Sequence, residues 1–290
     1  MSILSDKLID SFISKYNLPI WIKPYVKEYL KKKKNIRYIL TFVKYGKKKG
    51  NIKTDSITLP NGVIFKKKHM VHLLNLFYYG TYSIKSVSDY WIQNSLGNLK
   101  LKHRFIPIAE IEEKRSLVIK NLISGLNYNI YKKAPSKELN DIFDYLKKLN
   151  DWNERLVAKE IILNYSYVIP FGNVFYTIFY PIAPKYMKSF KKFIGHLEYE
   201  INNKRDAENI ITQKLIKEER LKQLVKDLII KVIKSINAEI KNTKEVNIYD
   251  EIILLRDIAA VYPIYKINEL DKEFEVDELF NDIDIKKLLK

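Results

Sequence analysis

The sequence predicts an α+β protein that is predominantly α-helical, with a small N-terminal antiparallel meander, a buried central β-hairpin and long C-terminal helices. Apolar residues recur at helical 3/4 spacing over much of the chain. Residues 36–65 are instead rich in β-branched and aromatic residues and are interrupted by turn signals. With 290 residues, 47% of them hydrophobic, the chain is long enough to bury a substantial core.

The N-terminal part is predicted to form two helices followed by the meander. Residues 5–16 place apolar side chains at helical spacing, and residues 23–34 follow Pro24 and end in four lysines. Strands are expected at residues 36–45, 52–59 and 63–65, because a Gly-Lys-Lys-Lys-Gly turn and an Asn-Gly hairpin signal separate them.

A helix-turn-helix-like pair is expected next. Helices at residues 68–79 and 84–93 are separated by Gly80, and the alternating residues 99–105 suggest a strand or wing after them. This spacing has no diagnostic residue, so ordinary packed helices are the alternative.

The remaining elements are mostly helical. Further elements are expected at residues 109–124 (closing at Gly125), 135–150, 151 onward (capped by Asp151), 165–180 (the buried hairpin), 206–242 (one long amphipathic helix), 246–261 and beyond 277. We therefore expect a basic N-terminal domain over residues 1–133, a helical domain over residues 134–262 and an acidic tail over residues 263–290.

The positive charge is unevenly distributed. The chain has 52 Lys and Arg against 34 Asp and Glu, a formal charge of +18, and residues 30–68 alone carry +12. Residues 263–290 carry −3. Abundant Lys, Ile, Asn and Tyr also indicate AT-rich codon bias, but bias alone should spread the lysines along the chain. Few Gln and Met and no Cys are compatible with a thermophilic source, and we expect an AT-rich virus, plasmid or thermophile.

A local excess of Lys attracts polyanions, and aromatic residues interleave with it. We expect the nucleic-acid-binding residues to be Lys31, Lys32, Lys33, Lys34, Arg37, Lys44, Lys47, Lys48, Lys49, Lys66, Lys67, Lys68, Lys100, Lys102 and Arg104. Scarce Arg predicts weak sequence specificity, because Lys contacts to phosphate read little base information. Duplex DNA is favoured over RNA.

Most catalytic signatures are missing from the sequence. The chain has no Cys, no phosphate-binding glycine loop, no GxSxG and no HExxH. His69 and His72 have a permissible metal-ligand spacing, but no third ligand is near in sequence, so we interpret them as solvated or half-buried residues. The acids at residues 110–113, 141–144 and 151–154 suit helix starts. We expect a protein that is not an enzyme and holds no cofactor or metal, an unrecognised metal-dependent nuclease being the alternative.

Two other classes remain open. A virion or assembly protein would place its basic face against nucleic acid or against the acidic tail of a neighbouring subunit, giving self-association. Peripheral membrane attachment through residues 20–34 is the less favoured alternative. No signal peptide or long uncharged apolar run is seen, which predicts a cytoplasmic protein, or one inside a host cell or virion.

Overall fold

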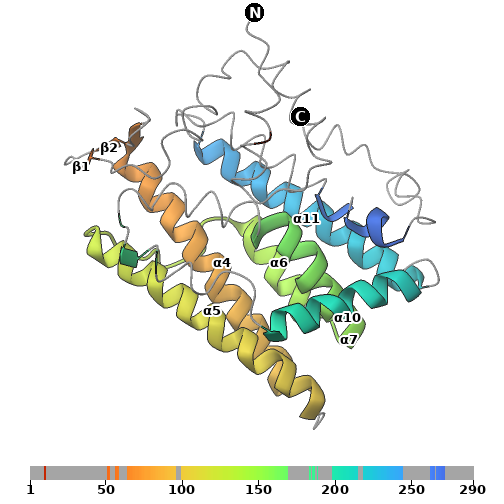
Figure 1. The fold of residues 1–290 in the computed structure, drawn as a ribbon. Coiled ribbons are helices and arrows are strands. Elements are labelled where there is room, and N and C mark those ends of the chain that lie inside the picture. Colours follow the sequence, from red (N-terminus) through yellow and green to blue (C-terminus); the bar gives the residue numbers. More distant parts are fainter. Residues whose placement is uncertain are drawn as a thin grey trace, which may run out of the picture.

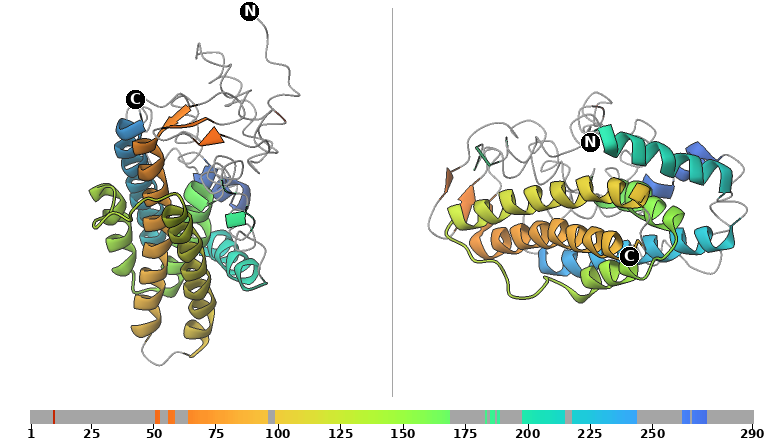
Figure 2. Two further views of the ribbon diagram at one scale, coloured as in Figure 1. Left: turned by 90° about the vertical axis from the view of Figure 1, so that its left-hand side faces the viewer. Right: turned by 90° about the horizontal axis from the view of Figure 1, so that it is seen from below.

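In the computed structural model, the longest elements of the described residues are two antiparallel helices of 27 residues each, α4 (Lys67–Gln93) and α5 (Leu99–Gly125) (Figure 1). They lie side by side over most of their length in all three views (Figures 1 and 2). The structure describes residues 10, 51–52, 56–58, 64–95, 99–168, 183, 185–186, 188, 198–214, 218–243, 262–264 and 266–271.

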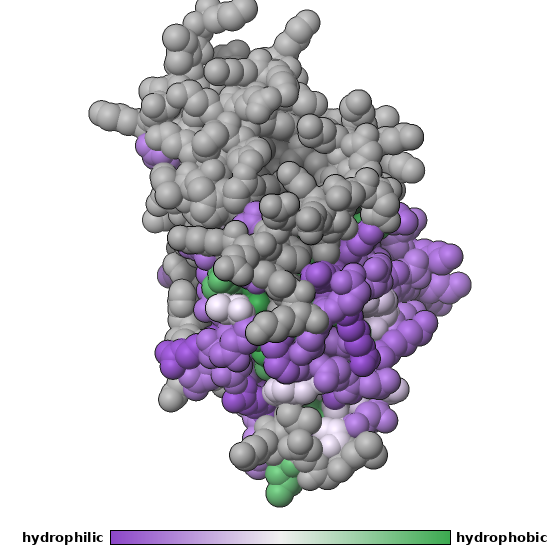
Figure 3. Space-filling model, turned by 90° about the vertical axis from the view of Figure 1, so that its right-hand side faces the viewer, coloured by the Kyte–Doolittle hydropathy of each residue, from purple (hydrophilic) through white to green (hydrophobic). Residues whose placement is uncertain are grey.

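The main further helical elements of the described residues contact this pair directly or through one another. They are α6 (Lys137–Lys147), α7 (Trp152–Leu156), the π-helix η2 (Val157–Val168), α10 (Glu198–Lys214) and α11 (Glu219–Thr243). α6 contacts both α4 and α11, and α10 contacts α5, α7 and η2. The side of the molecule that lies on the right in Figure 1 is mostly hydrophilic where its residues are described (Figure 3).

One hydrophobic cluster joins these helices. Trp91 of α4 packs on Phe105 of α5 with ring centroids 5.0 Å apart, and Phe105 packs edge-on against Trp152 of α7 at 4.8 Å. The Trp91 indole donates a hydrogen bond of 3.0 Å to the Leu146 carbonyl of α6. Because the same cluster extends to Ile267, packing joins residues on both sides of position 133. The division into domains stays a prediction.

The predicted α+β class is wrong, because the described chain is predominantly helical. The strands β1 (Asn51–Ile52), β2 (Ser56–Thr58) and β3 (Ile64–Lys66) hold only two or three residues each and pair antiparallel in the order β1-β2-β3. In the described residues, these strands are much shorter than the meander predicted at residues 36–45, 52–59 and 63–65. The first predicted strand, at residues 36–45, lies outside them.

The central hairpin predicted at residues 165–180 is also wrong for the part of it that the structure describes, residues 165–168. Tyr165 to Val168 form the last turn of the π-helix η2 rather than a strand. Tyr165 is 4% exposed and packs edge-on against Tyr262 at 4.8 Å, so burial between helices overrides the β-propensity of an aromatic run. Residues 169–182 lie outside the described part.

The predicted helix-turn-helix-like pair is likewise wrong, because α4 continues as one helix through Gly80. Thr81, expected in the turn, donates its hydroxyl to the carbonyls of Phe77 and Tyr78 in the preceding turn. Residues 99–105, expected as a wing, form the start of α5. Tertiary packing along the whole length of both helices outweighs the local turn signal.

The single helix predicted at residues 206–242 is two helices, α10 and α11, with Glu218 in neither. By contrast, the helices predicted to begin near Pro135 and at Asp151 are seen as α6 and as α7 continuing into η2. The elements predicted at residues 5–16, 23–34, 246–261 and beyond 277 lie outside the described residues, apart from Asp10. Of the helices that the structure describes, none combines the length and apolar content needed to cross a membrane.

Candidate nucleic-acid interface

The described part of the basic segment is the junction of β3 and α4. Lys66 occupies the N-cap position with extended backbone angles, and Lys67 and Lys68 follow in the first turn; the side chains of Lys66 and Lys68 are exposed. A Lys side chain has no acceptor and cannot cap the free backbone N–H groups, and the first turn contains no acid. Three lysines thus stand at the positive end of the helix dipole, where a cation is unfavourable.

The other predicted binding residues lie in two places. Lys31 to Lys34, Arg37, Lys44 and Lys47 to Lys49 lie outside the described residues. Lys100 and Lys102 are in the first turn of α5, and Lys102 is half-buried. Since α4 and α5 are antiparallel, this turn lies near the C-terminal end of α4, far from Lys66.

Arg104 is engaged with other parts of the fold. Its guanidinium pairs with the carboxylate of Asp206 on α10 and lies 5.9 Å from the ring centroid of Trp152. The Arg104 carbonyl also accepts a hydrogen bond from Asn203 at 3.5 Å. Arg104 therefore connects α5, α7 and α10, a role that its sequence context does not indicate.

The segment between α5 and α6 crosses the outward face of α4. Asn75 of α4 is fully buried beneath it: its side chain donates to the Asn129 carbonyl at 3.4 Å and accepts from the Tyr131 N–H at 2.7 Å. The Tyr79 hydroxyl donates to the Tyr131 carbonyl at 2.5 Å. The next two residues in the chain, Lys132 and Lys133, are exposed. The hydrogen bonds thus fix two lysines beside α4.

Three tyrosines lie next to this crossing on α4. The rings of Tyr78 and Tyr82 stack with centroids 5.8 Å apart and an interplanar angle of 15°, and Tyr79 packs edge-on against Tyr78 at 5.6 Å. Tyr82 is 49% exposed. Burial and then the neighbouring phenols raise the pKa values of Tyr78 and Tyr79, so these rings stay neutral near pH 7.

A polar contact between α4 and α11 lies beside the crossing segment. His72 Nε2 lies 2.5 Å from Glu239 Oε2, and the His72 ring centroid lies 6.2 Å from that of Tyr131. Burial, and then the charge of Glu239, raise the pKa of Tyr131. The sequence suggests a half-buried His72 but gives no indication of Glu239, which is 167 positions away in the chain.

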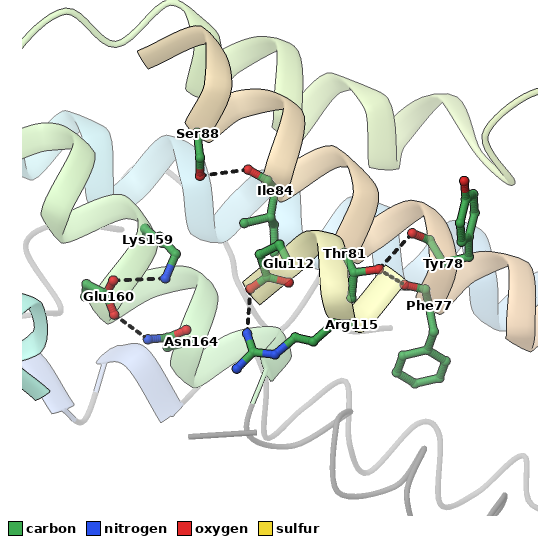
Figure 4. Close-up of polar contacts among 10 residues, drawn as sticks. All are labelled: Phe77, Tyr78, Thr81, Ile84, Ser88, Glu112, Arg115, Lys159, Glu160 and Asn164. Carbon is green, nitrogen blue, oxygen red and sulfur yellow. Dashed lines mark hydrogen bonds and ion pairs between the residues drawn. The ribbon is translucent and has the colours of Figure 1, made fainter. Parts of the chain in front are cut away.

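Two buried ion pairs lie deeper in the molecule (Figure 4). Arg115 donates to Glu112 at 2.6 Å within α5, and Lys159 donates to Glu160 at 2.9 Å within η2, where Asn164 also donates to Glu160 at 2.7 Å. Each of the four charged residues is at most 5% exposed. This burial favours a structural role, because a charge in the core needs a partner.

Within the described residues, no group of three or more His, Asp or Glu side chains is arranged to hold a metal ion. His69 is buried, whereas the sequence suggests a solvated or half-buried side chain. Comparison with known proteins found no matching family model, no similar curated protein and no similar solved structure.

The sequence prediction missed the crossing segment and the tyrosines. In the sequence, Lys132 and Lys133 stand at the end of the predicted N-terminal domain, residues 1–133, and are not among the expected binding residues. The available signal was spacing: Lys68, Asn75 and Tyr82 are seven residues apart and share one face of a continuous helix. A predicted break at Gly80 concealed that relation.

Proposed function

We propose that the protein binds nucleic acid, with weak sequence specificity, through the Lys-rich segment that ends at the start of α4. The observation that carries the proposal is the position of Lys66, Lys67 and Lys68 at the positive end of α4. Codon bias explains many lysines but not three in succession where the dipole makes them costly. A bound phosphate backbone would offset that cost, because a helix N-terminus and lysines attract the same anion.

The charge distribution supports the same proposal. Residues 30–68 carry +12 of the total +18, and the exposed Lys132 and Lys133 add positive charge beside α4. Lys predominates over Arg, which favours electrostatic contact with phosphates over readout of base edges.

A salt series tests the proposal on the full chain. If about six lysines contact phosphates, affinity for a labelled DNA should fall about 10³-fold between 50 and 200 mM salt. The triple variant Lys66→Ala, Lys67→Ala, Lys68→Ala should bind more weakly and show a shallower salt dependence, measured by fluorescence anisotropy.

A matched control removes the same number of charges elsewhere. Lys114, Lys120 and Lys148 are exposed on α5 and at the end of α6, so their replacement by Ala should lower affinity much less. Equal losses in the two triple variants would mean that only net charge matters. Absence of binding at 50 mM salt, or binding that ignores salt, would contradict the proposal itself.

A further inference from the structure

The outward face of α4 carries a line of three residues at heptad spacing. Lys68, Asn75 and Tyr82 are seven positions apart, so each lies about 10 Å from the next along the helix axis and nearly on the same face. Lys68 and Tyr82 are exposed, whereas Asn75 is covered by the segment that carries Lys132 and Lys133. Cationic side chains therefore lie on the same face as an exposed aromatic ring.

The ring of Tyr82 is held in a defined orientation. One of its faces stacks on Tyr78, which in turn packs against Tyr79, and Tyr79 is anchored by its hydrogen bond to Tyr131. An aromatic residue that is 49% exposed yet held by a second ring loses little conformational freedom when a flat ligand stacks on it.

Among the described residues, the lysines on the N-terminal side of Tyr82 favour an anionic ligand there. Toward the C-terminal end of α4, Lys85 pairs with Asp89 at 2.6 Å, so its charge is neutralised. Toward the N-terminal end lie Lys68 and the crossing segment, in which Lys132 and Lys133 directly follow Tyr131, the residue that is hydrogen-bonded to Asn75 and Tyr79. A phosphate chain that reaches Tyr82 is therefore drawn toward the crossing segment and the start of α4.

We propose that this face binds single-stranded nucleic acid, with an unpaired base stacked on Tyr82 and the phosphates along Lys132, Lys133 and Lys68. The inference rests on the proposed function and narrows it, because the paired bases of a duplex are stacked on each other and do not offer a free face. Aromatic stacking is tolerant of sequence, which agrees with the expected weak specificity.

The test compares three ligands on the full chain by fluorescence anisotropy: a 20-nucleotide DNA single strand, its duplex, and the same strand with its bases replaced by abasic sites. Wild-type protein should bind the single strand about 5- to 150-fold more tightly than the abasic strand, since one stacked base contributes in that range. This comparison needs no variant and does not depend on any variant folding.

Variants locate the effect. Tyr82→Ala should lower single-strand affinity to near that of the abasic strand, whereas Tyr82→Phe keeps the ring and should restore it. Tyr90→Ala is the matched control, because Tyr90 is 41% exposed on the same helix about 12 Å farther along, and it should change nothing. Replacing Lys132 and Lys133 by Ala should weaken binding of the normal and abasic strands alike.

The possible results separate the two proposals. Equal affinity for normal and abasic strands, or an unchanged affinity in Tyr82→Ala, overturns the stacking inference while leaving phosphate binding intact. Tighter binding of the duplex than of the single strand also overturns the stacking inference and leaves phosphate binding intact. Failure to bind any of the three ligands overturns the proposed function together with the inference.

Discussion

His72 and Glu239 join the first turns of α4 to the last turns of α11 through a contact of 2.5 Å between Nε2 and Oε2. The two side chains are 17% and 8% exposed, so solvent screens the contact only weakly. We expect His72→Ala and Glu239→Gln to destabilise the fold by about 1–3 kcal/mol each, because each leaves a buried partner poorly satisfied.

A double-mutant cycle isolates this contact. Urea denaturation of both single variants and of the double variant should give a coupling free energy of about 0.5–3 kcal/mol, the range for residues in direct contact. Strictly additive losses would mean that the two side chains act independently and that other neighbours account for their effects.

Gly80 lies inside a continuous helix, and space is available at its α-carbon. A Cβ added there meets no atom within 4 Å outside the helix itself. Gly80→Ala should therefore raise the free energy of unfolding by about 0.5–1 kcal/mol, because Ala has the higher helix propensity. Thermal denaturation followed by circular dichroism measures the change. A lower melting temperature would support the Gly-containing turn that the sequence suggests.

The residues on the two sides of Gly80 show why the sequence prediction divided α4 into two helices. Met70 and Leu74 before it, and Val87 and Trp91 after it, are all buried, and their spacing continues one apolar face across the glycine. Local turn preference pointed to a break, whereas the long apolar face pointed to one helix. Packing of that face against α5 keeps the helix continuous. A prediction from a few neighbouring residues does not take this packing into account.

Asp151 is a helix start that the sequence did predict. Its Oδ1 accepts hydrogen bonds from the backbone N–H groups of Asn153 at 2.8 Å and Glu154 at 3.2 Å. Such a cap is encoded within four residues, so local sequence suffices to find it. Asp151→Ala should destabilise the protein by about 0.5–2 kcal/mol, and Asp151→Asn by less, because Asn also caps. Urea denaturation tests both; equal losses would show that the negative charge, not the cap, stabilises the helix.

Only part of the candidate interface could be predicted from the sequence, because the rest of it depends on tertiary contacts. The run Lys66 to Lys68 is visible in the sequence as charge, but its position at the start of a helix dipole depends on where α4 begins. Lys132 and Lys133 lie beside α4 only because Asn75 holds the crossing segment, a contact between residues more than fifty positions apart. Composition identifies a charge excess, whereas tertiary contacts determine which charges share a face.

High pH should destabilise the protein through its buried phenols. Burial, and then Asp227, which accepts a hydrogen bond of 3.4 Å from the Tyr145 hydroxyl, raise the pKa of Tyr145 to about 12. Burial likewise raises the pKa of Tyr165 to about 12. In the unfolded chain these phenols lose their protons near pH 10, whereas in the folded protein they keep them to about pH 12. Their contribution to stability is therefore complete below about pH 10 and is lost as the pH rises to about 12.

Urea midpoints measured at intervals from pH 8 to pH 12 should show this fall. Tyr145→Phe removes one of the titrating groups, so its midpoint should fall less steeply above pH 10 than that of the wild type, whatever its value at pH 8. The remaining slope comes from phenols such as Tyr165. Parallel curves for the two proteins above pH 10 would show that Tyr145 ionises equally readily in the folded and unfolded chain.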